Sequence, residues 1–174
     1  FFRDRGFAYW YSMDHLLYDG PKMPESCLAA GVEIRPYEDE HFEEFVRAMA
    51  DAFIPQRRFF DFRPHDVREL YEREDGRGRT LQSRDDKFVL LDNGKLAAIV
   101  ELEGNFIDTV GVDLAARGKG YGKALMQFSV NLLRDRGHKN VETSVVLGNV
   151  PAWRLYNVLG FRRVQADEWA CKWI

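Results

Sequence analysis

The chain has 174 residues, a length that suits one domain with a substantial hydrophobic core. Its 25 Lys and Arg residues are outnumbered by 28 Asp and Glu, which argues against a dedicated nucleic-acid-binding protein, since such proteins usually carry a basic excess. No apolar run approaches the roughly 20 residues of a membrane helix, no signal peptide is recognisable, and the cysteines lack metal-ligand spacing. We therefore expect a cytoplasmic protein with no metal site and with neither a membrane nor a nucleic acid as partner.

The first 31 residues are predicted to be an addition to the main domain. Phe1 to Tyr18 is rich in aromatic side chains and indicates the end of a helix, a stop at Gly6 and then an extra edge strand. Gly20 to Gly31 contains two prolines, which favour a linker laid over the surface. We place a boundary after this linker, so that residues 1–31 precede a domain formed by residues 32–174.

Helices are predicted between residues 32 and 86. After a short strand in VEIRPY, apolar residues at helical spacing indicate an amphipathic helix from Asp39 to Phe53, which Pro55 would end. A second helix is expected from Pro64 to about Glu74. The charged, glycine-containing stretch DGRGRTLQSRDD is interpreted as an exposed loop.

An antiparallel meander is the clearest topological signal in the chain. Asn93-Gly94 is the favoured two-residue hairpin turn, and Gly104-Asn105 marks a second reversal. The strands would span about 88–91, 96–103 and 106–113.

The last third of the chain predicts a crossover between parallel strands. A glycine cluster separates the third strand of the meander from a helix that begins near Tyr121 and stops at Gly137. A strand follows in NVETSVVLG, Pro151 opens a short helix, and the chain finishes in extended structure. The predicted fold class is therefore α/β of the α+β type, with a mixed central sheet that is antiparallel at first, then parallel, and flanked by helices.

The glycine cluster, Gly118, Gly120 and Gly122, has the local form of a phosphate site. Unpaired N–H groups at a helix N-terminus point outward, and the helix dipole favours an anion there. Two known phosphate motifs do not fit. The dinucleotide motif needs glycine where Lys123 stands, and the triphosphate loop fails at Arg117. The pattern that fits is Arg-x-x-Gly-x-Gly.

With these motifs the sequence resembles the GNAT superfamily of acyl-CoA-dependent N-acyltransferases. The resemblance extends over roughly Val32 to Trp173 and is sharpest in VGVDLAARGKGYGKALM and NVPAWRLYNVLGF. It implies the GNAT fold, in which the parallel strand pair splays at the switch point. It also implies that acetyl-CoA is a co-substrate, that backbone amides of the glycine turn hold its pyrophosphate, and that its pantetheine arm lies between the splayed strands.

The resemblance assigns residues of three segments to coenzyme A. Gly111 lies within a strand, where a glycine marks a bulge or a close approach of backbone. It could therefore allow the pantetheine arm to bind along the slot between the splayed strands, or it could relieve crowding in the core. Asn149 matches a position that bonds pantetheine or orders water, and it could also cap the next helix. The assigned residues are Val110, Gly111, Val112, Arg117, Gly118, Lys119, Gly120, Tyr121, Gly122, Lys123 and Asn149.

Amine acylation needs a proton acceptor for the amine and a proton donor for the departing thiolate. Tyr156 matches the tyrosine that serves as general acid in many family members, with packing on the sheet as the alternative. A backbone amide near Val110 is the expected oxyanion donor. For the base we favour Asp108, which by alternation should share one strand face with Val110 and Val112. Glu101, Glu103 or a water relay are the alternatives.

Acceptor recognition is expected to fall to the segment from Phe53 through Arg84. Arg57, Arg58 and Arg63 surround three phenylalanines there, and they could line a pocket for an anionic or apolar acceptor, form a dimer contact or be a solvated connection.

The activity expected is transfer of an acetyl group from acetyl-CoA to a primary amine of a small molecule or peptide, by direct attack in a ternary complex. A homodimer would follow the habit of the family. Phe106 departs from members with a Glu there, which keeps a second hypothesis open, a silent acyl-CoA sensor of the same fold. A nucleotide-binding protein of another fold is the third.

Overall fold

The computed structural model describes residues 3–73 and 75–172 and contains one seven-stranded sheet in the order β2-β3-β4-β5-β6-β1-β7. Neighbouring strands are antiparallel except β5 and β6, which are parallel. This confirms the predicted mixed sheet, with a meander followed by a parallel pair. The strands are β1 (Ala8–Tyr18), β2 (Val32–Pro36), β3 (Lys87–Asp92), β4 (Lys95–Glu103), β5 (Phe106–Val112), β6 (Val141–Val146) and β7 (Arg162–Cys171).

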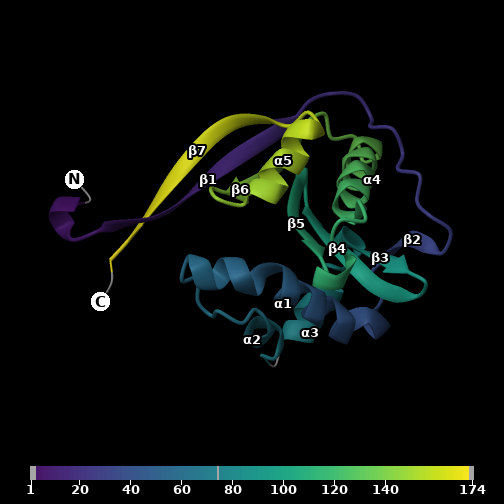
Figure 1. The fold of residues 1–174 in the computed structure, drawn as a ribbon, viewed down its shortest axis with the longest axis horizontal. Helices are drawn as coiled ribbons and strands as arrows, with labels where there is room; N and C mark the ends of the chain where they lie inside the picture. Colours follow the sequence, from purple (N-terminus) through teal and green to yellow (C-terminus); the bar gives the residue numbers. More distant parts are fainter. Residues whose placement is uncertain (1–2, 74, 173–174) are drawn as a thin grey trace.

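Helices cover both faces of the sheet. α4 and α5 lie on one side, and α1, α2 and α3 lie on the other (Figure 1). Each side has its own hydrophobic cluster, around Leu125 and Met126 on the α4 side and around Phe45 on the α1 side. No helix in the described ranges is long and apolar enough to cross a membrane. The α-helices are α1 (Phe42–Phe59), α2 (Arg68–Tyr71), α3 (Gly76–Gln82), α4 (Tyr121–Asp135) and α5 (Val150–Val158).

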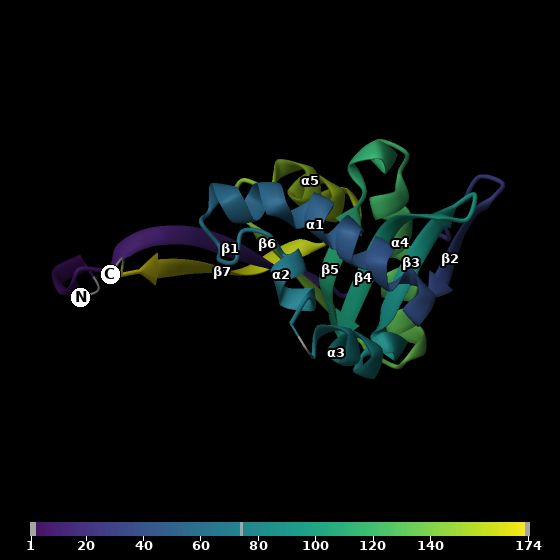
Figure 2. The ribbon, with the colours of Figure 1, turned by 90° about the horizontal axis from the view of Figure 1, so that it is seen from below.

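β1 is an interior strand, so the prediction of an extra edge strand is wrong. It pairs with β6 from Met13 to Tyr18 and with β7 along almost its whole length. The predicted boundary after residue 31 thus divides strands of a single sheet. β1 and β7 also continue past the other strands as a two-stranded ribbon (Figure 2).

The segment predicted as a linker, Gly20 to Gly31, runs as an extended strap across α4 and carries the chain from β1 to the opposite edge of the sheet at β2. Asn131 of α4 bonds the backbone of Met23 twice, accepting from its N–H at 2.7 Å and donating to its carbonyl at 2.9 Å. Gln127 donates to the Pro24 carbonyl at 3.0 Å and also contacts Ser26. These bonds satisfy polar backbone groups of a segment that has no neighbouring strand.

α1 continues to Phe59 instead of ending at Pro55. A proline within a helix removes one backbone hydrogen bond, which destabilises the helix by roughly 3 kcal/mol. The helix continues because Phe53 and Ile54 pack against the α1-side cluster, and this packing offsets the missing bond.

The loop predicted at residues 75–86 is also wrong, because α3 occupies Gly76–Gln82. A Cβ at Gly76 would lie 2.2 Å from the Tyr71 carbonyl oxygen, so this glycine lets α3 start directly against the end of α2. Thr80 is buried and donates to the Gly76 carbonyl at 3.0 Å. The predicted helix from Pro64 to Glu74 is reduced to the single turn of α2.

Candidate active site

The parallel pair β5 and β6 separates soon after it begins. The strands pair only at Phe106 with Glu142 and at Ile107 with Thr143, and β6 continues to Val146 paired with β1 alone. The Thr143 hydroxyl donates to the Ile107 carbonyl at 2.8 Å, which ties the strands together where they diverge. The structure therefore has the splayed switch point that the resemblance implies.

The pairing of β5 with β4 determines which N–H and C=O groups of β5 face the slot, which is the region between β5 and β6 where these strands diverge. Asp113 donates its N–H to the Ala97 carbonyl at 3.0 Å, and alternate residues of an antiparallel strand bond the same neighbour. Gly111 therefore bonds β4, whereas Val110 and Val112 direct their N–H and C=O groups away from β4, toward β6.

Crowding accounts for the glycine at position 111. A Cβ at this position would lie 3.1 Å from the Ile99 Cγ1 atom and 3.2 Å from the Ala52 Cβ atom. The bulge in β5 lies earlier, where the register shifts so that Asp108 has no partner on β4. The backbone N–H and C=O groups of Gly111 thus face β4, unlike those of Val110 and Val112.

The bulge also changes the direction of Asp108. The prediction that Asp108 shares a face with Val110 and Val112 is wrong, because one extra residue reverses the alternation. Val110 and Val112 pack against the α4-side cluster, whereas Asp108 and Thr109 both line a cavity on the α1 side. The Thr109 hydroxyl donates to the Asp108 carboxylate at 3.1 Å.

The glycine turn before α4 has the backbone conformation of an anion site. Gly118 and Gly120 have φ values of 82° and 85°, a left-handed conformation that favours glycine. Among the described residues, no backbone or side-chain acceptor bonds the N–H groups of residues 118–123. Gly122 is helical, and a Cβ there would make ordinary contacts at 3.5 Å with Val112 and Leu155. The turn therefore presents unpaired donors at the positive end of a helix.

Asp92, at the end of β3, anchors the glycine turn. Its Oδ2 atom accepts from the Lys119 ammonium at 2.9 Å and from the Tyr121 hydroxyl at 2.7 Å. These two hydrogen bonds, Lys119 first, hold the pKa of the Asp92 carboxyl below its usual range. Lys119 is thereby tied to a carboxylate, whereas Arg117 has no carboxylate partner in residues 3–73 and 75–172 and only reaches the Val112 carbonyl at 3.5 Å.

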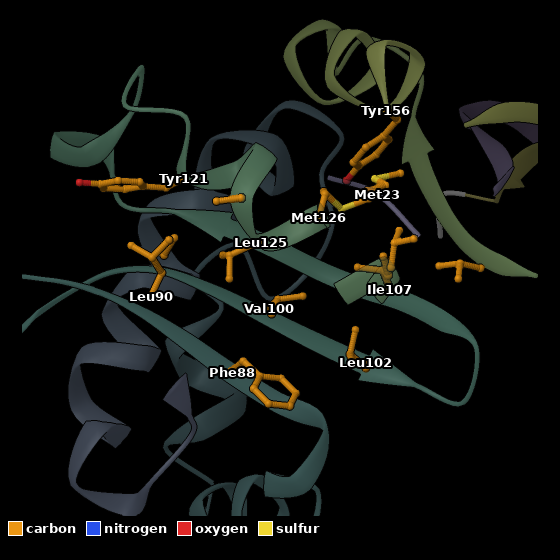
Figure 3. Close-up of a cluster of buried hydrophobic side chains, with 14 of the residues drawn as sticks. Met23, Phe88, Leu90, Val100, Leu102, Ile107, Tyr121, Leu125, Met126 and Tyr156 are labelled. Carbon is orange, nitrogen blue, oxygen red and sulfur yellow. The ribbon is translucent and has the colours of Figure 1, made fainter. Parts of the chain in front are cut away.

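Tyr156 lies where β5 and β6 diverge, because it hydrogen-bonds the side chain of Thr143 in the last pair of these strands. It is 7% exposed and extends from α5 toward the core around Met126 (Figure 3). Burial raises the pKa of its phenol, and a hydrogen bond with the Thr143 side chain opposes that rise. The phenol thus stays protonated at neutral pH, next to the point where β5 and β6 diverge. Asn149 caps α5, where its Oδ1 atom accepts from the Ala152 N–H at 3.3 Å.

A cavity of about 390 Å³ lies across β5 from the slot, beneath α1, α2 and α3. At its base Lys87 and Glu101 form an ion pair with side chains only 11% and 13% exposed. Tyr71 also lines the cavity, and burial, with smaller contributions from the Glu101 and Asp108 carboxylates, raises the pKa of its hydroxyl. Asp108 therefore lies among polar side chains of the cavity, at the bulged end of β5.

The three carboxylates considered as the general base differ in their relation to the cavity. Glu101 lines the cavity but is held by Lys87, whereas Glu103 is exposed at the end of β4 and does not line the cavity. Asp108 lines the cavity and has no cationic partner in the described part of the chain.

The sequence reasoning missed Lys87, Tyr71, Asp92 and Thr143. A lysine at the start of an otherwise apolar strand was a signal for a buried pair, because lysine is almost never fully buried unless it is paired. Asp92 precedes the Asn93-Gly94 turn, so the local sequence explains it as a turn residue and hides its contact with the glycine turn.

Residues 43–161 match the model of the acetyltransferase (GNAT) family. The chain belongs to the GNAT acetyltransferase family. This match confirms the resemblance stated from the two motifs, and the seven-stranded mixed sheet confirms the fold class.

Two curated relatives are named mycothiol acetyltransferase. The protein from Thermomonospora curvata is 33% identical over 154 residues, which cover 87% of this chain and 50% of the relative. That from Saccharomonospora viridis is 30% identical over 159 residues, covering 84% and 49%. The chain thus spans about half the length of the curated relatives it matches.

Solved structures share the GNAT fold at lower identity. A GCN5-related N-acetyltransferase from Sphaerobacter thermophilus matches with a TM-score of 0.70 and 21% identity, covering 94% of this chain and 52% of its own. The PaiA N-acetyltransferase from Thermoplasma acidophilum, solved in complex with coenzyme A, matches with a TM-score of 0.61 and 15% identity, covering 79% and 99%.

Proposed function

We propose that this GNAT domain transfers an acetyl group from acetyl-CoA to the primary amine of a small molecule, by direct attack in a ternary complex. The observation that carries the proposal is the unpaired row of N–H groups at residues 118–123, beside the end of β5, a strand that diverges from β6 next to Tyr156. The names of the curated relatives support acetyl transfer and a small-molecule acceptor over a peptide.

The residues present fit coenzyme A in shape and charge. The amides of the glycine turn would hold the pyrophosphate, with Arg117 and Lys123 exposed beside them. Val110 and Val112 offer backbone groups along the slot, where the amides of a pantetheine arm could bond them as a strand would. Asn149 follows β6, the other strand of the splayed pair, and keeps its amide nitrogen available, because only Oδ1 caps α5.

The acceptor side lies in the cavity under α1. An alkyl ammonium has a pKa near ~10.4, so it must lose a proton before its nitrogen can attack. Asp108 would accept that proton directly or through a water, and the neutral nitrogen then bonds to the thioester carbon. The N–H of Val110 faces the slot and would donate to the oxygen of that carbonyl as it becomes an oxyanion.

Tyr156 would act as the general acid. As the carbon–sulfur bond breaks, its phenol gives a proton to the departing thiolate, and the thiol of coenzyme A leaves. The second proton, which the nitrogen loses as it becomes an amide, would return to the phenolate through water. The raised pKa of Tyr156 keeps this proton in place before the reaction. Thr143 would position the phenol, since it contacts both the ring hydroxyl and the strand at the point of divergence.

The proposal is tested by thiol release from acetyl-CoA with a panel of small amines, read alongside mass spectrometry of the products. We expect turnover with part of the panel, and Tyr156→Phe should lower kcat about 100-fold or more while coenzyme A affinity changes little. The matched control is Tyr37→Phe, because Tyr37 is a buried tyrosine outside the site whose hydroxyl has no partner among the described atoms.

Each result separates the proposal from its alternatives. Tight coenzyme A binding without turnover of any amine would favour the sensor hypothesis. ATP or NAD bound at least as tightly as coenzyme A would overturn the family-based site altogether. Equal kcat for the Tyr156 and Tyr37 variants would remove Tyr156 from the mechanism.

A further inference from the structure

The charges that line the acceptor cavity do not all neutralise one another. Lys87 and Glu101 pair at its base. Arg79 is held by Asp75 and donates to the Leu70 carbonyl at 3.1 Å. Two charged side chains of the cavity lining remain, Arg57 and Asp108.

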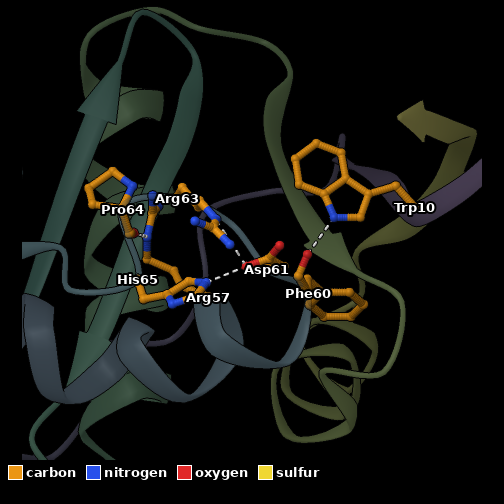
Figure 4. Close-up of polar contacts among 7 residues, drawn as sticks. All are labelled: Trp10, Arg57, Phe60, Asp61, Arg63, Pro64 and His65. Atoms are coloured by element: carbon orange, nitrogen blue, oxygen red, sulfur yellow. Dashed lines mark hydrogen bonds and ion pairs between the residues drawn. The ribbon is translucent and has the colours of Figure 1, made fainter. Parts of the chain in front are cut away.

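Arg57 is held in place by a hydrogen bond from its side chain to a backbone carbonyl, and this bond does not use the two terminal nitrogens of the guanidinium. It lies in the last turn of α1, half-buried, and its Nε atom donates to the Pro64 carbonyl at 2.6 Å. Figure 4 shows this arrangement and the nearby carboxylate of Asp61, which is bound by His65 and Arg63. Within residues 3–73 and 75–172, no carboxylate forms an ion pair with Arg57. Its two terminal nitrogens can therefore bind a ligand.

Asp108 is the complementary group. The carboxylate of Asp108 accepts a hydrogen bond from the Thr109 hydroxyl, and across the described residues it has no ammonium or guanidinium within ion-pair distance. One cavity thus offers a carboxylate for an ammonium and a guanidinium for an anion. A ligand that carries both an ammonium and an anion can pair with both groups, whereas a simple amine pairs with Asp108 alone, so the ligand with both charges is favoured.

We propose that the acceptor is a zwitterion, an amine that also carries an anionic group such as a carboxylate, and that Arg57 is the residue that selects for this group. The proposal rests on the acetyltransferase function above and adds to it the charge class of the acceptor. The planar guanidinium can bind a carboxylate with two parallel hydrogen bonds, which gives both affinity and orientation. The carboxylate would then fix the position of the amine relative to Asp108.

The other arginines of this segment serve as internal controls. Arg58 is exposed and absent from the cavity lining, and Arg63 is 78% exposed on its side chain and contacts Asp61. The three arginines are therefore distinct in the fold, although the sequence left them equivalent.

The test uses a series of ω-amino acids of increasing length, from glycine to 6-aminohexanoate. Each acid is compared with the compound in which a primary amide replaces the carboxylate and the amino group is unchanged. The series samples the unknown separation between the two ligand groups. Binding is measured by calorimetry on the coenzyme A-loaded chain, which needs no turnover, and kcat/KM is measured with acetyl-CoA. We expect at least one acid to bind about 10- to 100-fold more tightly than its amide. Arg57→Gln should remove this preference, Arg57→Lys should restore part of it, and Arg58→Gln should retain it.

The outcomes are distinguishable from failure of the proposed function. Acids and amides that bind equally well, or an Arg57→Gln change that weakens both equally, would overturn the zwitterion proposal while acetyl transfer to amines stands. A chain that binds the acids selectively and turns over no amine would instead count against the transferase and leave the role of Arg57 intact. Thermal unfolding of both glutamine variants checks that neither loss is due to unfolding.

Discussion

The two sides of β5 contrast in how they are built. On the side of the glycine turn, the candidate site consists mainly of backbone, with N–H groups of residues 118–123 and of the slot-facing valines. On the opposite side, the cavity consists of side chains from α1, α2, α3 and three strands. Backbone donors recognise phosphates and amides of any coenzyme A, whereas side-chain charges distinguish one acceptor from another. The bulge at Asp108 is where the two sides meet.

The largest effect on kcat should come from Asp108, on the side of β5 where the candidate site consists of side chains. Asp108→Asn removes the proton acceptor while it retains the hydrogen bond with Thr109, so we expect kcat to fall about 100-fold or more and coenzyme A affinity to change less than about 2-fold. Steady-state kinetics and calorimetry measure the two quantities separately. Glu103→Gln is the matched control on the neighbouring strand and should leave kcat unchanged.

A kcat that survives Asp108→Asn would point to the water relay or to Glu101. The variant Glu101→Gln would test Glu101, but it also leaves the Lys87 ammonium buried without a partner. In comparable buried pairs this change lowers the free energy of unfolding by about 3–5 kcal/mol. The melting temperature of the variant should therefore fall, and its kinetics are meaningful only below the new transition.

The backbone side was predictable because its signals are contiguous. The hairpin turn, the glycine cluster, the helix stop at Gly137 and the proline at the start of α5 all act within a few residues, and the structure places each where the local pattern indicates. Gly118 and Gly120 have positive φ, which a glycine pattern can reveal without any knowledge of the rest of the fold.

The side-chain side was not predictable, because its determinants are distant in sequence. α1 continues through Pro55 owing to packing, and α3 forms in a stretch with loop composition because Gly76 and Thr80 fit against α2. The position of β1 depends on two partners more than 120 residues away. Strand alternation gave the wrong face for Asp108, because a bulge is a property of two strands and β5 alone does not reveal it.

An intermediate effect should come from Gly120→Ala, which tests the backbone side directly. Alanine in the left-handed conformation costs about 1–2 kcal/mol, so the turn should shift and coenzyme A affinity should fall about 10-fold or more. Gly137→Ala is the control at the other end of α4. Its φ of 91° is equally left-handed and an added Cβ there meets open space, as at Gly120.

Calorimetry with coenzyme A and thermal unfolding of both variants separate binding from stability. The melting temperatures should fall by similar amounts, whereas only Gly120→Ala should lose affinity. Equal affinities would mean that the conformation at residue 120 does not contribute to binding, and the phosphate site would have to lie elsewhere.

The smallest expected effect is the change in coenzyme A affinity on substitution of Asp92, and the direction of this change is informative. The carboxylate ties Lys119 and places a negative charge beside the turn, so Asp92→Asn should release Lys119 and tighten coenzyme A binding about 2- to 5-fold at low salt. The depressed pKa of Asp92 keeps it ionised below its ordinary value near ~3.9, so the gain should be present throughout the neutral range. It should vanish near 1 M salt, where the screening length is about 3 Å. Binding that weakens instead would show that the ion pair with Lys119 shapes the turn, because the asparagine retains an acceptor for the Tyr121 hydroxyl but loses the ion pair. Lys119→Gln distinguishes these cases, since it should change affinity less than Arg117→Gln if Lys119 is already neutralised.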